Sequence, residues 1–362
     1  MTVVAIVGAA LGFILLIILH ELGHFTAAKA VGMRVERFSL FFPPLLLRKK
    51  VGETEYALGA IPAGGYVKIS GMNPDEDLPD EVRTRAYYSQ PVWKRVTVIA
   101  AGPLVNFVLA FVLLLVLFAV IGPDTVSNRV GTIERGYPAA AALEPGDRIL
   151  AVDGRRGEPA ELSSAISDNR CAERPPRPRC RATQPVTLLV ERDGKRREIA
   201  LRPVYDPAAE RTRLGFAYAR GPRESLPLGE AVALTVNRFG FITWETIKLP
   251  LRLFDAEKRK EITGIVGSYE ITRQTILDDA ASVVGILGVI SLGLAVINLF
   301  PFLPLDGGHI FWAVVEKVRR RPVPFSVMER AGVVGFMLVM VLFVVGFTND
   351  IGRLTGDGFK VR

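Results

Sequence analysis

The chain has 362 residues, of which 49% are hydrophobic and 23% are charged, and its mean hydropathy is +0.30. This mean hydropathy is too high for an ordinary soluble protein and too low for a protein that lies entirely in a membrane. The net charge of +8 does not indicate nucleic acid as a partner, because many of the basic residues lie in short loops beside apolar stretches, where positive charge marks the cytoplasmic side of a membrane.

Four stretches without a charged residue are long enough to cross, or nearly cross, a bilayer; they are residues 1–19, 96–121, 281–305 and 331–349. Basic residues gather between the first and second stretches and between the third and fourth. This distribution predicts that the N-terminus and the long segment after the second stretch are extracytoplasmic. The first stretch has no basic segment before it and no cleavage site before His20, so we expect a retained span and not a cleaved signal peptide.

The first stretch runs directly into His20-Glu21-Leu22-Gly23-His24. Positions i and i+4 share one face of a helix, so His20 and His24 can offer two nitrogens to one tetrahedral metal ion. Glu21 is next to the first of them, close enough to take a proton from a water molecule at the metal. Such a short pattern also arises by chance, but an ionisable group inside a bilayer costs about 2.5 kcal/mol or more and is rarely kept without a function. The segment predicts zinc-hydrolase chemistry within a membrane.

The next segment, residues 31–93, is mixed in composition, with strand-like content at residues 34–47 and 54–69. The run 59–68 is dense in Gly and Pro, which marks tight turns or a close approach of backbones. One interpretation is a plain cytoplasmic hairpin. The other is a hairpin that dips back towards the metal and presents an edge to an extended substrate. In that case the candidate substrate-binding residues are Gly64, Gly65, Tyr66 and Val67.

The second apolar stretch contains Pro103 and Asn106, for which a kink and a structural contact with other helices are the favoured roles. After it, strand-like runs at 186–191 and 195–201 flank Asp193-Gly194, a hairpin signal. The segment 138–154 resembles part of a PDZ domain, although the usual Ala-Gly-Leu is here Ala142-Leu143. Such a domain implies a groove for a peptide or chain end.

The only two cysteines, Cys171 and Cys180, lie in a Pro- and Arg-rich insertion of this domain. Outside the cell a disulfide between them would persist, and this is favoured over two free thiols. Residues 225–254 are amphipathic, which is typical of a helix lying along a membrane surface.

A tetrahedral site with two histidines and a water molecule needs one more protein ligand. Asp306 follows 25 uncharged residues, from Ala281 to Leu305, and a carboxylate at such depth needs a partner. The remaining histidine, His309, is the alternative, but it lies nearer the basic stretch that follows. Asp306 is therefore the preferred third ligand.

Together, the His20–His24 motif, the segment Asn298 to Gly307 and the PDZ-like domain between them resemble the site-2 protease family of intramembrane zinc metalloproteases. The resemblance implies Zn²⁺ held by His20, His24 and Asp306, Glu21 as the catalytic base, and Asn298 as a residue that holds the substrate or the oxyanion. It also implies a membrane-reentrant hairpin that presents the substrate. Members cut single-span membrane proteins such as anti-sigma factors or signal-peptide remnants, in a bacterial cell (inner or plasma) membrane, with the active site towards the cytoplasm.

Two departures from the family pattern concern its accessory parts. Phe41-Phe42-Pro43-Pro44 stands where many relatives have a Gly-x-Gly-Pro turn, and there is one PDZ-like segment where some have two. Two other functions stay open on the residues alone. A zinc transporter or channel also places His and Asp in spans, but does not need Glu21. An inactive scaffold would bind peptides through the PDZ-like domain.

The predicted fold is a mainly α-helical membrane protein with four transmembrane helices, a membrane-associated β-hairpin and one extracytoplasmic PDZ (α+β) domain. The lipid bilayer and single-span membrane proteins are the predicted partners. The predicted order is a first span at 1–30, a cytoplasmic or reentrant β region at 31–93, a second span at 94–121, the PDZ domain at 122–220, an amphipathic helix and linker at 221–278, a third span at 279–306, a cytoplasmic-side helix and basic loop at 307–326, a fourth span at 327–349 and a tail at 350–362.

Overall fold

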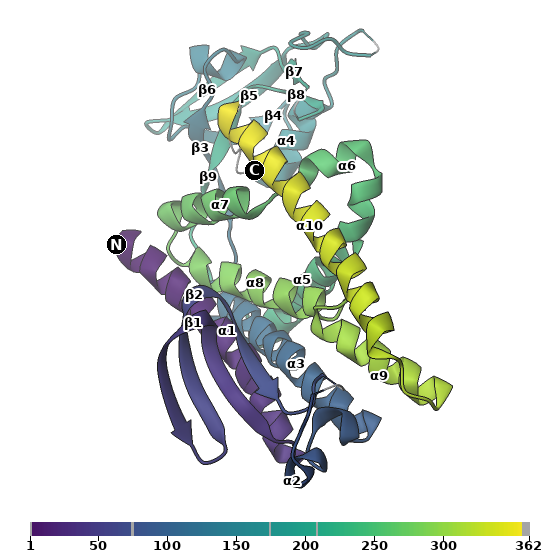
Figure 1. The fold of residues 1–362 in the computed structure, drawn as a ribbon. Coiled ribbons are helices and arrows are strands. Elements are labelled where there is room, and N and C mark those ends of the chain that lie inside the picture. Colours follow the sequence, from purple (N-terminus) through teal and green to yellow (C-terminus); the bar gives the residue numbers. More distant parts are fainter. Residues whose placement is uncertain (1, 74–75, 174, 208, 357–362) are drawn as a thin grey trace. The chain divides into compact units, whose positions relative to one another are not determined.

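The structure is a computed structural model and describes residues 2–73, 76–173, 175–207 and 209–356. The chain divides into two compact units, one made of Met1–Val120 and Leu226–Arg362 and the other of Ile121–Ser225. Figure 1 labels the helices and strands of both. A tail was predicted from residue 350, but the last helix, α10 (Phe325–Thr355), continues through residue 355. The rest of that tail, residues 357–362, lies outside the described residues.

Three helical segments of the described chain are long and apolar enough to cross a membrane: Val7–Ala30, Val92–Ile121 and Ser326–Thr355. They belong to α1 (Thr2–Ala30), to α3 (Val92–Val116) with the π-helical turn Leu117–Ile121, and to α10. The helix observed in place of the predicted third span, residues 279–306, is shorter than that prediction. Helix α8 (Ser282–Asn298) has 17 residues, which gives about 26 Å at 1.5 Å per residue, somewhat less than the ~30 Å of a hydrocarbon core.

The end of α8 corrects the predicted boundary of this third segment. The sequence placed Asp306 at the end of one continuous span, whereas the helix stops at Asn298 and a new helix, α9 (Asp306–Arg319), begins at Asp306. The loop between them contains Pro301 and Pro304, which cannot donate the backbone hydrogen bonds of a continuing helix. Asp306 is thereby the first residue of a helix.

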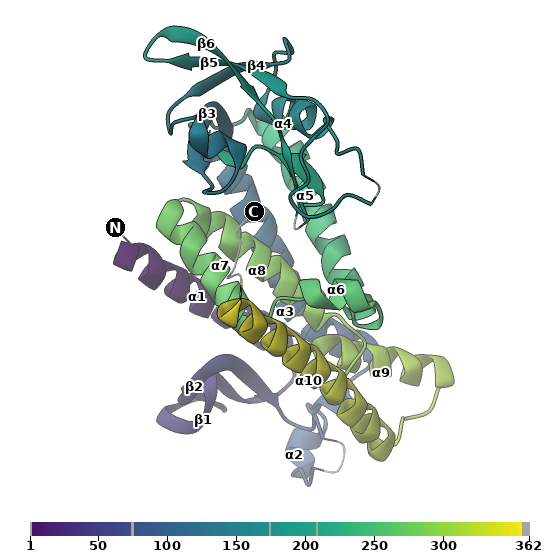
Figure 2. The ribbon, with the colours of Figure 1, turned by 90° about the horizontal axis from the view of Figure 1, so that it is seen from above.

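The centre of the larger unit is α3, which packs against α1 and α8, and these helices lie side by side in both views (Figures 1 and 2). Leu114 of α3 and Leu292 of α8 are buried in one apolar cluster, and Ala28 of α1 and Val98 of α3 in another. The outer faces of the helices remain apolar: Leu11, for example, is 60% exposed and Val108 56% exposed. Large exposed apolar faces of this kind suit a lipid environment.

The β region consists of β1 (Val35–Val51) and β2 (Thr54–Ile69), paired antiparallel with repeated register shifts. Ser39 lies opposite both Ala57 and Tyr66. The first half of β1 therefore runs between the two halves of β2, while the second half of β1 pairs back onto the start of β2. As a result, the end of β2 forms one edge of this small sheet.

Glu53, in the turn between β1 and β2, ties the hairpin to its surroundings. It accepts hydrogen bonds from Arg85 at 2.8 and 2.9 Å and from Lys29 at 2.7 Å. Hydrogen bonds from the two cations, with the larger effect from Arg85, lower the pKa of this carboxyl to about 2.

Replacing Glu53 with glutamine is expected to destabilise the larger unit by roughly 0.5–1 kcal/mol at neutral pH, since the carboxylate is partly exposed. Because the pKa is lowered on folding, the stabilisation is present above the ordinary value of 4.5 and is lost as the pH falls through about 2. Thermal unfolding in detergent, from pH 7 downwards, should show wild type and variant converging. A difference that does not change with pH would contradict the assignment, and Glu81→Gln on the exposed helix α2 (Asp80–Arg83) is the control.

The segment after the smaller unit forms α5 (Leu228–Lys248), a 3₁₀ turn Leu249–Phe254, α6 (Ala256–Glu261) and α7 (Ile265–Asp278). Helix α5 is amphipathic, as expected. It buries Ala231 and Ile242 but leaves Val236 and Trp244 more than half exposed.

The smaller unit is built on a five-stranded sheet, whose strands follow the order β6 (Lys195–Leu201), β5 (Val186–Arg192), β4 (Arg148–Val152), β3 (Val126–Ile133) and β9 (Phe216–Arg220). The hairpin expected around Asp193-Gly194 is β5–β6, and Val130, Ile149, Leu162 and Leu188 belong to a buried apolar core. Cys171 and Cys180 are joined by a disulfide. The other described elements of this unit are the 3₁₀ turn Pro138–Ala141, α4 (Pro159–Ser167), β7 (Val204–Asp206) and β8 (Arg211–Arg213).

Candidate metal centre

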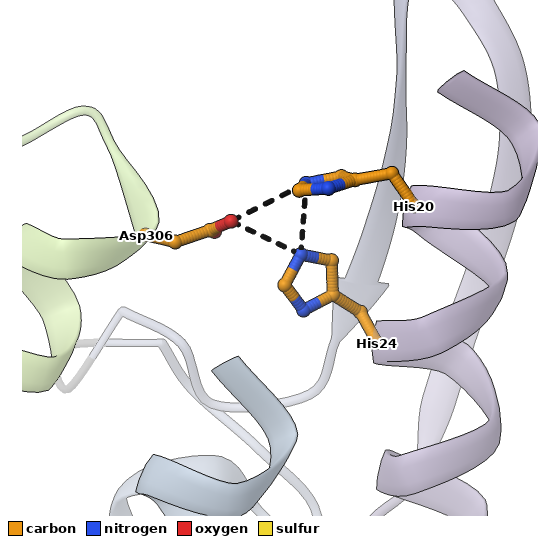
Figure 3. Close-up of side chains that lie close together, drawn as sticks. All are labelled: His20, His24 and Asp306. Carbon is orange, nitrogen blue, oxygen red and sulfur yellow. Dashed lines mark hydrogen bonds and ion pairs between the residues drawn. The ribbon is translucent and has the colours of Figure 1, made fainter. Parts of the chain in front are cut away.

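His20 and His24 of α1 and Asp306 at the start of α9 converge on one point (Figure 3). The Nε2 atoms of the two histidines are 3.3 Å apart. Asp306 Oδ2 lies 3.3 Å from His20 Nε2 and 3.2 Å from His24 Nε2. Both histidines are buried, at 6% and 7% exposure. Among the described residues, this is the group of three whose ligand atoms could hold one metal ion.

The spacing of these three atoms fits a tetrahedral metal ion. Zinc bonds to His nitrogen and carboxylate oxygen of about 2.0–2.1 Å place the ligand atoms of a regular tetrahedron roughly 3.3–3.4 Å apart. The three observed separations lie at that value or just below it. Moreover, Oδ2 of Asp306 is buried, and among the described residues it contacts the two imidazole nitrogens without a further hydrogen bond. A cation between the three atoms would satisfy the carboxylate and both imidazoles, so the residues fit zinc.

The second histidine is oriented by the backbone of α3. His24 Nδ1 lies 2.9 Å from the carbonyl oxygen of Val98. A carbonyl only accepts, so Nδ1 carries the proton and Nε2 turns its lone pair towards the cluster. Gly102 makes room for the ring, because a Cβ at that position would lie 2.2 Å from His24 Nε2. The sequence predicted His24 as a metal ligand, but it did not predict this close crossing of α1 and α3.

The first histidine contacts Asn106 of α3, whose amide nitrogen lies 3.3 Å from His20 Nδ1. Asn106 is fully buried. The sequence favours a structural packing role for this residue, and its contact with the cluster was not predicted. A polar side chain in the middle of an apolar helix was the signal that could have indicated the contact.

Asp306 is held in place from both sides. Before it, the chain folds tightly onto the start of α9, where a Cβ on Gly307 would lie 2.2 Å from the carbonyl oxygen of Leu299. Further along α9, Glu316 accepts two hydrogen bonds, at 2.8 and 2.9 Å, from the buried guanidinium of Arg95 near the start of α3. The helix that carries the aspartate is thereby fixed to α3, which contacts both histidines.

A cavity of about 530 Å³ opens beside the cluster. Glu21 faces it from α1 and Asn298 from the end of α8. The edge of the β region contributes the four predicted residues, and a Cβ on Gly65 would lie 2.8 Å from Glu21 Cγ. All sequence-predicted site residues therefore line this one cavity: His20, Glu21, His24, Gly64, Gly65, Tyr66, Val67, Asn298 and Asp306. The alternative ligand, His309, lines a different cavity of about 140 Å³, next to Arg95 and Glu316.

Comparison with known sequences agrees with this site. The profile of peptidase family M50 matches residues 8–342. A protein of Brucella suis is 31% identical over 92% of this chain and 92% of its own length. One from Nostoc is 30% identical over 94% of both chains, and one from Clostridium perfringens is 30% identical over 96% of this chain and 98% of its own. Each is described in its name, provisionally, as a zinc metalloprotease.

Among solved structures, the PDZ domain of an SdrC-like protein from Listeria innocua matches 28% of this chain and all of its own length, with 18% identity and a TM-score of 0.22. The family profile, by contrast, covers both halves of the candidate site, and the resemblance to site-2 proteases is confirmed. The chain belongs to peptidase family M50.

Proposed function

We propose that this protein is an intramembrane zinc metalloprotease that hydrolyses peptide bonds within or near the transmembrane segments of single-span membrane proteins. One observation carries the proposal. Two imidazole nitrogens and a carboxylate oxygen, from helices far apart in the sequence, lie 3.2–3.3 Å from one another beside a cavity that also contains Glu21. Family membership and the names of the relatives support the same reaction.

In this proposal His20, His24 and Asp306 hold the zinc ion. A bound zinc ion supplies Lewis-acid chemistry, polarising the scissile carbonyl and making water acidic enough to attack it near neutral pH. Glu21, next to His20 and facing the cavity, takes the proton from the attacking water. The same carboxyl then gives the proton to the leaving amine.

The remaining cavity residues would bind and orient the substrate. Asn298 could donate a hydrogen bond from its amide to the oxyanion, a contact worth about 3 kcal/mol in other hydrolases. The edge of β2 at Gly64 to Val67 lies beside Glu21. A peptide bond inside a helix is poorly exposed, so a substrate has to unwind, and pairing with this edge would hold it extended.

The proposed setting is a bacterial cell membrane. Helices α1, α3 and α10 would cross the bilayer, and the shorter α8 would form the fourth crossing. The basic loops would face the cytoplasm, with the active site towards that side. The N-terminus and the smaller unit would be extracytoplasmic, where this unit would bind a peptide or chain end as a PDZ domain.

The direct test is reconstitution of the purified protein into vesicles with a panel of single-span membrane proteins from the same cell. Mass spectrometry should identify cuts within or next to the membrane segment. A zinc chelator should abolish these cuts, and added zinc should restore them. If the protein carries stoichiometric zinc but cuts none of the panel, while zinc enters vesicles loaded with a zinc indicator, the transporter interpretation replaces this one.

Replacing Gly65 with alanine is expected to reduce cleavage by roughly tenfold or more without loss of zinc. The new methyl group would lie 2.8 Å from Glu21 Cγ and 3.0 Å from the carbonyl oxygen of Ser39, so the proposed base has to move, and displacements of about 1 Å can cost 10²-fold. Zinc content and cleavage are measured on the same preparation. Unchanged cleavage would show that the position of Glu21 against β2 does not matter to the reaction.

A further inference from the structure

The two histidines of the candidate metal centre differ in how their protons are positioned. His24 Nδ1 faces the carbonyl of Val98 at 2.9 Å, which can only accept a hydrogen bond. His24 Nδ1 therefore carries a proton with or without a metal ion, and Nε2 is the nitrogen left to bind one. His20 Nδ1 faces the side-chain amide of Asn106 at 3.3 Å, and an amide can either donate or accept.

Asn106 is fixed by its backbone, but within the described part of the chain one of its side-chain polar atoms lacks a hydrogen bond. The residue is fully buried, and its backbone oxygen accepts a hydrogen bond of 2.9 Å from Ser291 Oγ of α8. Its side-chain nitrogen points at His20, while its side-chain oxygen is buried without a hydrogen-bond partner among the described residues. Among these residues, no second hydrogen bond of the side-chain oxygen therefore fixes the amide in this orientation.

Each orientation of this amide suits one tautomer of His20. With the nitrogen towards the ring, Nδ1 accepts, Nε2 carries the proton, and Nε2–H can donate to Asp306 Oδ2 at 3.3 Å. With the amide rotated by half a turn, the oxygen accepts from Nδ1–H and the Nε2 lone pair is free to bind a metal ion. Rotation exchanges atoms of nearly equal size, so the surrounding side chains need not move.

We propose that Asn106 is the positioning residue of His20: its side-chain oxygen accepts the Nδ1 proton when the ion is bound, and this sets the tautomer that ligates. The inference rests on the proposed function, because it requires a metal ion at the cluster. It gives α3 a side chain that positions a metal ligand, in addition to the Val98 carbonyl that faces His24. In this arrangement α3 orients both histidines, one through a backbone carbonyl and the other through a side chain.

The test compares Asn106→Leu with Asn106→Asp. Leucine has nearly the same shape and cannot accept a hydrogen bond, whereas aspartate is an acceptor that can hold the Nδ1 proton. We expect zinc affinity, measured by competition with a chromophoric chelator, to fall by about 10–100-fold in Asn106→Leu and to stay within a few-fold of wild type in Asn106→Asp. Cobalt substituted for zinc should give a wild-type visible spectrum in the aspartate variant and an altered one in the leucine variant.

A packing role predicts the reverse order, because leucine suits an apolar helix and a buried carboxylate does not. Full zinc affinity in Asn106→Leu, or an equal loss in both variants, would overturn the proposal. If the leucine variant fails to fold, Asn106→Ser replaces it, since a serine hydroxyl is too short to reach Nδ1. Thr235→Val, at another fully buried polar position, is the control and should bind zinc normally. Wild-type protein without stoichiometric zinc would instead count against the proposed function itself.

Discussion

Replacing Glu21 with glutamine is expected to lower the rate of peptide-bond cleavage by about 10²–10⁴-fold while leaving the zinc content of the protein unchanged. Glutamine keeps the size of the side chain and its packing against Gly65, but it cannot take a proton from water at neutral pH. Because Glu21 does not belong to the group of three residues that could hold the metal ion, zinc should remain bound. Single-turnover cleavage and zinc analysis of the same preparation give the two readouts.

This substitution also distinguishes the proposed protease from a zinc transporter. A zinc transporter has no need for a proton acceptor beside His20, so zinc entry into vesicles would be unaffected. Glu230→Gln in the exposed first turn of α5 is the matched control and should cleave at the wild-type rate. Wild-type cleavage by Glu21→Gln would remove Glu21 from the mechanism.

A second large effect is expected from a single methyl group at Gly102. In Gly102→Ala the new Cβ would lie 2.2 Å from His24 Nε2 and within 2.7 Å of two ring carbons. The ring then has to turn away, losing both the 2.9 Å contact with the Val98 carbonyl and the 3.2 Å approach to Asp306. Removing outer contacts of a metal ligand costs 10–100-fold in affinity. Displacing the ligand itself should therefore weaken zinc binding by at least ~100-fold and abolish cleavage.

Gly293→Ala in α8 is the matched control, because a Cβ there meets no atom within 4 Å. Alanine is also the better helix former, by up to about 1 kcal/mol, so a general loss of helix stability does not explain a defect in Gly102→Ala. Chelator competition measures zinc affinity, and circular dichroism reports helix content. If Gly102→Ala binds zinc as tightly as wild type, the close crossing of α1 and α3 at His24 is not as the structure has it.

Some parts of the site could be predicted because they depend on local geometry. The helical repeat places His20 and His24 on one face whatever surrounds them, and Glu21 follows from its neighbour. Asp306 was found for an energetic reason: a carboxylate after a long apolar run needs a partner. The predicted spans at each end of the chain coincide with long apolar helices for the same reason, since hydropathy is a property of the segment itself.

The sequence by itself thus determined the chemical identity of the cluster, the apolar helices and the β-rich segment, because residue type and spacing encode them. Only the tertiary structure decided that the third apolar segment ends at Asn298 and that Asp306 opens a new helix. It also decided that Gly102 lies on His24 and Asn106 on His20. These contacts join residues more than 70 positions apart, and no local pattern records which of many apolar faces will meet. Packing selects them, because the close approach of α1 and α3 requires small residues where the helices cross.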